Sequence, residues 1–202
     1  VIFHQDEPFG SFSIIAQYLI FERIHNKFDI KVVLSGQGGD ETMMGYLKYF
    51  FFYLDHLKKQ FRFDLIIKEL LASLINGTVV LQNKLSTAKR YIPYYLNKTD
   101  DFITIKGLPE KTWASDSLRI RQQLDIDKYS VPNLARFEDR NSMAFSIETR
   151  LPFLDHRLVG FLLNLKENLK IKNGWTKYIL RESMTELPKQ IRWRKDKRSF
   201  II

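Results

Sequence analysis

Apolar residues recur every three or four positions through most of the chain, the spacing that places them on one face of an α-helix. Residues 11–27 show this pattern with Ile14, Ile15, Tyr18 and Leu19. Gly77 and Pro132 suit the end and the first turn of a helix. The pattern predicts a mainly helical protein, with further helices over 46–59, 63–77, 113–126, 132–146, 156–165 and 176–184.

Two apolar runs lack this helical spacing and predict strands. The chain opens on one of them, VIFH at residues 1–4. The run from Ile30 to Leu34 has no polar alternation after Lys31, which is typical of a strand covered on both faces in a parallel sheet. A helix between two such strands forms a β-α-β unit, so we expect an α/β fold.

Composition limits the classes of protein and of chemistry. The 202 residues are 45% hydrophobic, which suits a packed globular domain, and the net charge of +9 favours polyanionic partners such as nucleotides or nucleic acid. The absence of cysteine excludes disulfides, thiolate zinc sites and a cysteine nucleophile within the chain, and allows a cytoplasmic location. The most apolar run, Tyr49–Leu54, is too short to span a bilayer. The start at Val1, without a signal peptide, suggests a piece of a longer protein.

The strand at 30–34 leads into SGQGGDE, a loop suited to an anion. Ser35 and the glycines of this loop carry little or no side chain, so their N–H groups could approach a ligand closely at the carboxyl end of the strand. Asp40 and Glu41 would repel a bare phosphate unless Mg²⁺ lies between them. The alternative is a tight strand-to-helix turn in which Asp40 is the N-cap. The glycines are Gly36, Gly38 and Gly39.

Charged residues elsewhere give further candidates, each with a structural alternative. Asp6 and Glu7 could join Asp40 around a metal ion, or cap the following helix. In the stretch 138–155, acids and arginines alternate with apolar residues that we expect to be buried, so the charges must be paired or bind a charged ligand. The structural alternatives there are an ion pair between Glu148 and Arg150, and a helix cap at Asp155.

Lys177 is predicted near the start of a helix, where the helix dipole disfavours a cation unless an anion shares the site. Arg181 falls one turn later on the same face. The alternative for Lys177 is an ordinary surface lysine. The basic stretch 191–200 (IRWRKDKRSF) is typical of a solvated tail.

Taken in order, these motifs resemble the synthetase domain of the glutamine-hydrolysing asparagine synthetases, a branch of the PP-loop ATP pyrophosphatases. The motifs are DEPF, VVLSGQGGDE followed by GY, EDRNSMAFSIETRLPFLDH, GWTK with ILRE, and RKDK with SF. The resemblance is close over 1–46 and 139–200 and loose over 47–113. It implies the helix-rich C-terminal part of a PP-loop, adenine nucleotide alpha hydrolase-like, parallel-sheet domain.

The resemblance also implies a reaction, in which aspartate attacks the α-phosphorus of ATP, and ammonia then displaces AMP from β-aspartyl-AMP. By it, Ser35 and Gly36 lie against the adenylate, Gln37 lies near the acyl-adenylate, Asp40 holds Mg²⁺ and pyrophosphate, and Lys177 stabilises the transition state. Weaker candidates for orienting ligands in the same cleft are Arg140, Glu148 and Arg150.

The chain departs from the family pattern in ways that keep alternatives open. The resemblance implies that the pyrophosphate-binding SGGxDS motif and a glutaminase domain precede residue 1. We therefore expect the 202 residues alone to be inactive. The whole protein is a candidate homodimer. Gln37 stands where the family usually has Glu or Asp, and DETMMGY stands where it has DELFGGY. Alternatives are a related amide synthetase with another carboxylate substrate, a non-catalytic domain, and a basic module that binds nucleic acid, suggested by the net charge of +9 and the RWRKDKR run at 192–198.

Overall fold

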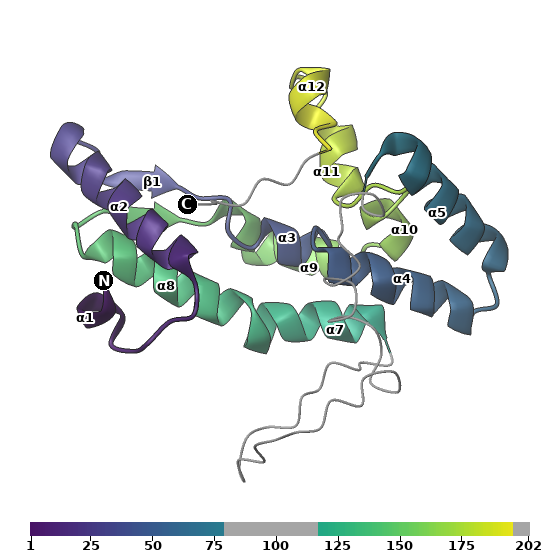
Figure 1. The fold of residues 1–202 in the computed structure, drawn as a ribbon, viewed down its shortest axis with the longest axis horizontal. Helices are drawn as coiled ribbons and strands as arrows, with labels where there is room; N and C mark the ends of the chain where they lie inside the picture. Colours follow the sequence, from purple (N-terminus) through teal and green to yellow (C-terminus); the bar gives the residue numbers. More distant parts are fainter. Residues whose placement is uncertain (79–116, 196–202) are drawn as a thin grey trace, which may run out of the picture. The chain divides into compact units, whose positions relative to one another are not determined.

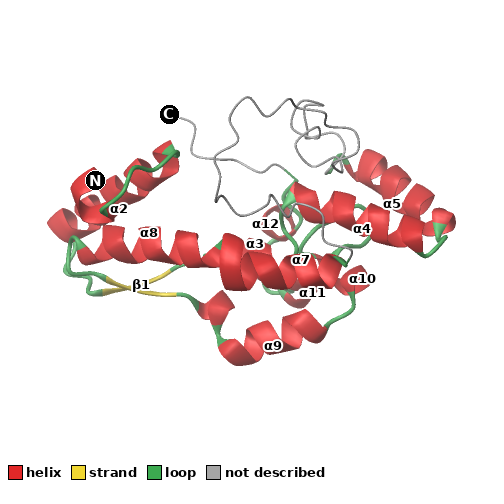
Figure 2. Cartoon of the chain, turned by 90° about the horizontal axis from the view of Figure 1, so that it is seen from below, coloured by secondary structure: helices red, strands yellow, loops and turns green. Residues whose placement is uncertain are grey.

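The computed structural model describes residues 1–78 and 117–195 (Figure 1). Most of these residues are helical, and a small parallel sheet completes a helix-rich α/β structure of the expected class (Figure 2). The chain divides into two compact units. The first comprises residues 1–42 and 123–164, and the second comprises the described residues of 43–122 and 165–196.

The first unit is built around two long helices, α2 (Phe12–Lys27) and α8 (Val131–Met143), which pack on each other. Ser11 caps α2, because its side chain accepts a hydrogen bond from the Ser13 N–H at 3.3 Å. The shorter elements of this unit are α1 (Ile2–Gln5), α3 (Gly39–Thr42), the π-helix η3 (Asp125–Tyr129), the 3-10 helix η4 (Pro152–Leu154) and α9 (His156–Asn164).

The predicted opening strand is wrong, because residues 2–5 form the short helix α1, which packs against α8. A run of four apolar and aromatic residues is too short for its periodicity to separate a strand from a helical turn. The predicted β-α-β unit is therefore also wrong. The parallel partner of the first strand comes from far along the chain instead.

The sheet pairs β1 (Val32–Leu34) with β2 (Glu148–Arg150) in parallel, with Val33 opposite Thr149. The expectation that β1 is covered on both faces is wrong, since Val32 is 41% and Leu34 is 71% exposed. In the described parts of the chain the sheet has two strands, and α8 packs on β2. An apolar strand sequence predicts that the faces of the strand are buried, but the sequence does not show which segment packs against them.

The second unit contains α4 (Leu47–Lys59) and α5 (Phe63–Asn76), and both helices confirm the periodicity predicted for them. Gly77 ends α5 with φ of +61°, and the Thr78 N–H donates to the Ser73 carbonyl at 2.9 Å. The core of this unit is formed by buried apolar side chains, namely Met44, Tyr49, Phe50, Tyr53, Leu57, Leu118 and Ile171.

The remaining helices of the described chain are short. They are α7 (Leu118–Leu124), α10 (Glu167–Lys170), α11 (Tyr178–Ser183) and α12 (Lys189–Arg192). Residues 113–116 of the helix predicted over 113–126 lie outside the described residues. None of the described helices has the length and apolar character needed to cross a membrane.

The C-terminal stretch is not a solvated tail over its described part. Residues 189–192 form α12, and the Trp193 ring packs edge-on against Trp175 with 5.1 Å between centroids. The Arg192 side chain is largely covered and pairs with Glu182 at 3.4 Å. Apolar residues within a basic run therefore attach it to the second unit, and residues 196–200 lie outside the described part of the chain.

A buried lysine in the second unit makes its stability depend on pH. Lys170 is 1% exposed, and its Nζ donates to Gln122 Oε1 at 2.8 Å. Burial lowers the pKa of Lys170 to about 8 from 10.5, against an opposing effect of nearby Glu167. Between these two values the unfolded chain binds more protons than the folded chain, so the Lys170 contribution to stability rises with pH.

We therefore expect the free energy of unfolding of the native protein, relative to that of Lys170→Met, to increase from pH 7.5 to pH 10. Urea unfolding at each pH measures this. Taking the difference removes the effect of Tyr53, whose pKa is raised to about 12 mainly by burial. A difference that stays constant with pH would show that Lys170 titrates normally.

Candidate functional site

The SGQGGD loop starts where the sheet ends, as predicted. The Ser35 N–H donates to the Arg150 carbonyl at 2.9 Å, which extends the ladder between β1 and β2 by one bond. Beyond it the chain turns at once, since the Gln37 N–H donates to Ser35 Oγ at 3.3 Å and the Gly39 N–H donates to the Gly36 carbonyl at 3.3 Å. The loop then enters α3, so its backbone lies at the carboxyl end of a parallel strand.

Two glycines of this loop are required by the fold. Gly38 has φ of +82°, and an added Cβ would lie 2.2 Å from Leu154 Cδ2. Gly39 is buried, and its added Cβ would press on the Phe153 ring at 3.2 Å. The η4 segment thus packs directly against the loop and fixes its path.

Gly36 differs from its two neighbours. It is exposed, its φ lies outside the left-handed region, and an added Cβ would meet nothing within 4 Å. Neither backbone conformation nor packing in the described chain therefore demands glycine at this position. The bare backbone of Gly36 leaves space beside Ser35 that a ligand could use.

The two acids of the loop have different surroundings. Glu41 is buried, and its Oε1 accepts a hydrogen bond from Ser130 Oγ at 2.5 Å, so it is a structural group of the first unit. Asp40 is half-buried within the first turn of α3, which begins at Gly39, so the alternative of Asp40 as the N-cap is wrong. A half-buried carboxylate at a strand end fits Mg²⁺, which takes one or two protein carboxylates with phosphates and water.

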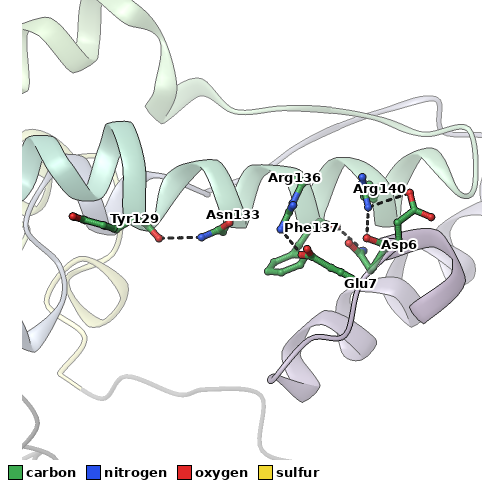
Figure 3. Close-up of polar contacts among 8 residues, drawn as sticks. Asp6, Glu7, Tyr129, Asn133, Arg136, Phe137 and Arg140 are labelled. Carbon is green, nitrogen blue, oxygen red and sulfur yellow. Dashed lines mark hydrogen bonds and ion pairs between the residues drawn. The ribbon is translucent and has the colours of Figure 1, made fainter. Parts of the chain in front are cut away.

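Asp6 and Glu7 do not join Asp40 in a metal cluster. Glu7 pairs with Arg136, and Asp6 pairs with Arg140 at 3.4 Å (Figure 3). Residues 1–78 and 117–195 hold no group of three or more acids or histidines placed to bind a metal ion. Asp40 as the Mg²⁺ ligand stays a prediction, without Asp6 or Glu7 beside it.

The Arg140 guanidinium also donates to the backbone carbonyl of Gln5. The structure thus places it between α8 and α1, while a role in orienting ligands stays a prediction. Glu148 and Arg150 form the expected ion pair, with Arg150 Nε donating to Glu148 Oε1 at 2.8 Å. Both residues are exposed on β2, and the apolar Ile147 directly before them is buried.

Asp155 caps α9, as its structural alternative predicted. Its Oδ1 accepts from the N–H groups of Arg157 at 2.9 Å and Leu158 at 3.3 Å. A side-chain hydrogen bond from Arg157, with these backbone bonds, holds the pKa of the Asp155 carboxyl well below its ordinary value. Asp155 is therefore an ionised cap at working pH.

Lys177 lies at the start of α11, as predicted, with an unusual backbone. It is the N-cap residue with φ of +52°, and it is half-buried. Left-handed backbone costs a residue other than glycine about 1–2 kcal/mol, so the surrounding turn holds Lys177 against this strain. Lys177 belongs to the second unit and the SGQGGD loop to the first, so a shared cleft stays a prediction.

Arg181, one turn after Lys177, is a structural residue. Its guanidinium lies 4.8 Å from the Trp175 ring centroid and donates to the carbonyls of Thr176 at 3.0 Å and Arg192 at 2.7 Å. Burial lowers the pKa of this group. Arg181 thus joins α11 to the C-terminal end of α12.

A buried polar cluster between α1, α2 and α8 was not predicted from the sequence. Gln5 Nε2 donates to Asn141 Oδ1 at 2.7 Å, and Asn141 Nδ2 donates to Gln17 Oε1 at 3.1 Å. Glu138 is 2% exposed, and burial raises the pKa of its carboxyl. The signal was present, since Leu134, Glu138 and Asn141 fall at helical spacing on the inward face of α8.

Comparison with known proteins points to one family over the whole chain. A family model described as "Asparagine synthase" matches residues 1–202. The glutamine-hydrolyzing asparagine synthetase of Homo sapiens is 43% identical over 184 residues, which are 89% of this chain and 22% of that protein. Asparagine synthetase 1 of Bacillus subtilis (strain 168) is 28% identical over 208 residues, 91% of this chain and 32% of that protein. The chain thus spans about a fifth to a third of these relatives.

Proposed function

Since this chain belongs to the asparagine synthase family, we propose that it forms part of a domain that makes asparagine from aspartate with ATP. The proposal includes a PP-loop parallel-sheet fold for the whole domain, and a first step that forms β-aspartyl-AMP and releases pyrophosphate. Ammonia from a glutaminase domain elsewhere in the protein displaces AMP in the second step. We further propose a cytoplasmic enzyme, with homodimerisation as a candidate state.

The observation that carries the proposal is the contrast among the glycines of the loop. Gly38 and Gly39 are explained by backbone conformation and packing, whereas Gly36 has open space where a side chain would stand. In our proposal the adenylate fills this space, against the backbone of Gly36 and the half-buried Ser35. Backbone groups at the carboxyl end of a parallel strand are where α/β sheets bind ligands.

The other loop residues take roles that follow from their chemistry. Gln37 has no charge, so it can orient the acyl-adenylate only by hydrogen bonds. Asp40 would hold Mg²⁺, which supplies positive charge to the phosphate oxygens when bound. Lys177 would offset the negative charge that grows on the phosphates in the transition state.

Gly36→Ala tests this arrangement. We expect the variant to fold with native stability, because the added methyl group meets nothing, and to bind ATP at least about tenfold more weakly, because that group occupies ligand space. Isothermal titration of ATP into the whole protein measures the affinity, and thermal unfolding measures the stability.

Gly38→Ala is the matched control, with the opposite expectation. Its φ of +82° and the clash with Leu154 should lower stability by about 2 kcal/mol or more. If Gly36→Ala binds ATP like the native protein, the adenylate does not lie against this loop and the proposal loses its main support.

A second candidate is a related amide synthetase that activates a different carboxylate. Gln37 favours it, because an amide in place of the usual acid changes the charge beside the acyl group. Pyrophosphate release by the whole protein, measured with aspartate and with a panel of other carboxylic acids, separates the two. Release with another acid and none with aspartate would establish the second candidate.

A further inference from the structure

A tight hairpin of the second unit leads to Lys177. The Lys172 N–H donates to the Trp175 carbonyl at 3.0 Å, and the Trp175 N–H donates to the Lys172 carbonyl at 2.9 Å. The two residues between them, Asn173 and Gly174, both have the positive φ that type I′ turns require. The hairpin thus fixes the chain to within two residues of Lys177, and other contacts must fix the rest.

The Arg181 side chain contacts both residues that lie between this hairpin and Lys177. Its Nε donates to the Thr176 carbonyl at 3.0 Å, and its guanidinium carbon lies 4.8 Å from the Trp175 ring centroid. Its Nη1 donates to two backbone carbonyls of the 192–194 segment, at 2.7 Å and 3.2 Å. A guanidinium can reach several fixed carbonyls at once because its donors form a planar fork. Arg181 thus joins the approach to Lys177 to the segment that follows α12.

Trp193, in the same segment, contacts the chain on both sides of Lys177. Its ring packs edge-on against Trp175 with 5.1 Å between centroids, and it is tilted against Tyr178 with 5.9 Å between centroids. Trp175 comes two residues before Lys177 and Tyr178 directly follows it. Aromatic pairs at these separations favour a defined arrangement of the rings. The Trp193 ring therefore restrains both ends of the short stretch that contains Lys177.

We propose that Arg181 and Trp193 are positioning residues, which together hold Lys177 in its left-handed conformation and so set the direction of its ammonium group. This inference rests on the proposed function for the role of Lys177 in the transition state. A left-handed backbone is unfavourable for lysine, so without these contacts residue 177 would relax to an ordinary φ. The relaxed backbone would turn the Cα–Cβ bond, and the side chain with it, in another direction.

The proposal predicts a loss of kcat without a loss of substrate binding. A lysine that offsets charge growing in the transition state contributes little to binding of ATP in the ground state. In the whole protein, Arg181→Lys and Trp193→Leu should lower kcat for pyrophosphate release by about 10- to 100-fold, the effect of misplacing a reacting group by about 1 Å. The KM values for ATP and aspartate should stay within about twofold of native.

Conservative variants separate geometry from charge and size. Arg181→Lys keeps the positive charge but lacks the planar fork, so it should be impaired as strongly as Arg181→Met. Trp193→Phe keeps an aromatic ring between Trp175 and Tyr178 and should retain most of the native kcat. If Arg181→Lys turns over like the native protein, charge alone is sufficient at this position and the proposal fails.

Leu57→Ala is the control for a general loss of stability. Leu57 is 4% exposed in the core of the same unit, so alanine should lower the unfolding temperature while Arg181 and Trp193 stay in place. We expect kcat of its folded fraction to stay within about twofold of native. If Arg181 and Trp193 had only a structural role, Arg181→Lys and Trp193→Leu would behave in the same way.

A double variant tests whether the effect acts through Lys177. In the Lys177→Ala background, Arg181→Lys should cause no further loss of kcat, because the group that it misplaces has already been removed. Multiplying losses from the two changes would overturn the proposal. A raised KM for ATP with native kcat in Arg181→Met would also overturn it, since Arg181 would then bind the substrate directly.

Hydrogen–deuterium exchange separates this inference from the proposed function. The amides of residues 175 and 181 donate to the carbonyls of Lys172 and Lys177, at 2.9 Å and 3.1 Å. Arg181→Lys and Trp193→Leu should speed exchange over 175–181, and Leu57→Ala should not. If the whole protein releases no pyrophosphate with any carboxylate but exchange responds as expected, the proposed function fails and the positioning of Lys177 stands. If exchange over 175–181 does not respond, the positioning role fails whatever the activity.

Discussion

Lys177→Ala should lower pyrophosphate release from ATP and aspartate by about 10²–10³-fold, the effect of removing one preorganised group that stabilises developing charge. Lys177 is the half-buried N-cap residue of α11, where the helix dipole disfavours a lysine unless an anion shares the site. The assay uses the whole protein with ammonium as the nitrogen source, so that glutamine hydrolysis is not required.

Lys172→Ala is the control for Lys177→Ala. Lys172 is an exposed lysine of the same unit, with its Nζ 5.2 Å from the Tyr178 ring centroid. The Lys172→Ala variant therefore removes the same charge from the same unit. We expect turnover of this variant to stay within about twofold of the native protein, as for an exposed cation–π contact. Equal losses from both variants would show a general effect of positive charge, and an active Lys177→Ala would remove Lys177 from catalysis.

Gly174→Ala should destabilise the second unit by about 2–5 kcal/mol, combining left-handed backbone with overpacking. Gly174 has φ of +74°, and an added Cβ would lie 2.4 Å from the backbone N and Cα of Ser73. The Gly174 N–H donates to Glu69 Oε2 at 2.7 Å, and its carbonyl accepts from Thr78 Oγ1 at 2.6 Å. Chemical denaturation monitored by tryptophan fluorescence measures the loss, since Trp175 is adjacent.

Gly160→Ala is the control for Gly174→Ala. Gly160 lies inside α9, where an added Cβ meets nothing within 4 Å, so alanine should raise stability by about 0.5–1 kcal/mol. If Gly174→Ala and Gly160→Ala have the same free energy of unfolding, Gly174 does not pack closely against Ser73 of α5. Because Lys177 follows Gly174 by three residues, Gly174→Ala should also lower activity in the fraction that remains folded.

The long helices could be predicted because each buries one face at a constant spacing. The observed helices Phe12–Lys27 and Phe63–Asn76 begin and end within one residue of the predicted ranges 11–27 and 63–77. The sheet could not be predicted in the same way, because β2 has only three residues and its pairing with β1 joins segments more than a hundred positions apart. Sequence separation of this size leaves no local signal.

The candidate loop was predicted from its residues, and the structure adds which glycines the fold requires. The requirement at Gly38 comes from Leu154 and that at Gly174 from Ser73, and neither neighbour is close in sequence. The burial of Glu138 was missed for a related reason. An acid on a helix is ordinarily assigned to the solvent side, and only the packing of α8 against α2 shows that this one is inside.

The exposed strand β1 has a consequence for residues 1–202 when they are separated from the rest of the domain. Val32 and Leu34 present apolar side chains, and in the described chain one edge of β1 has no strand partner. Such an edge is a template on which a strand of another molecule can add, the first step of aggregation. The exposed ion pair between Lys31 and Asp29, at 3.1 Å, stands directly before the strand and places charge where an incoming strand would start. In residues 1–202 taken alone these charges would act as gatekeepers of the β1 edge, whereas the larger parallel sheet proposed for the whole domain would pair that edge with a further strand.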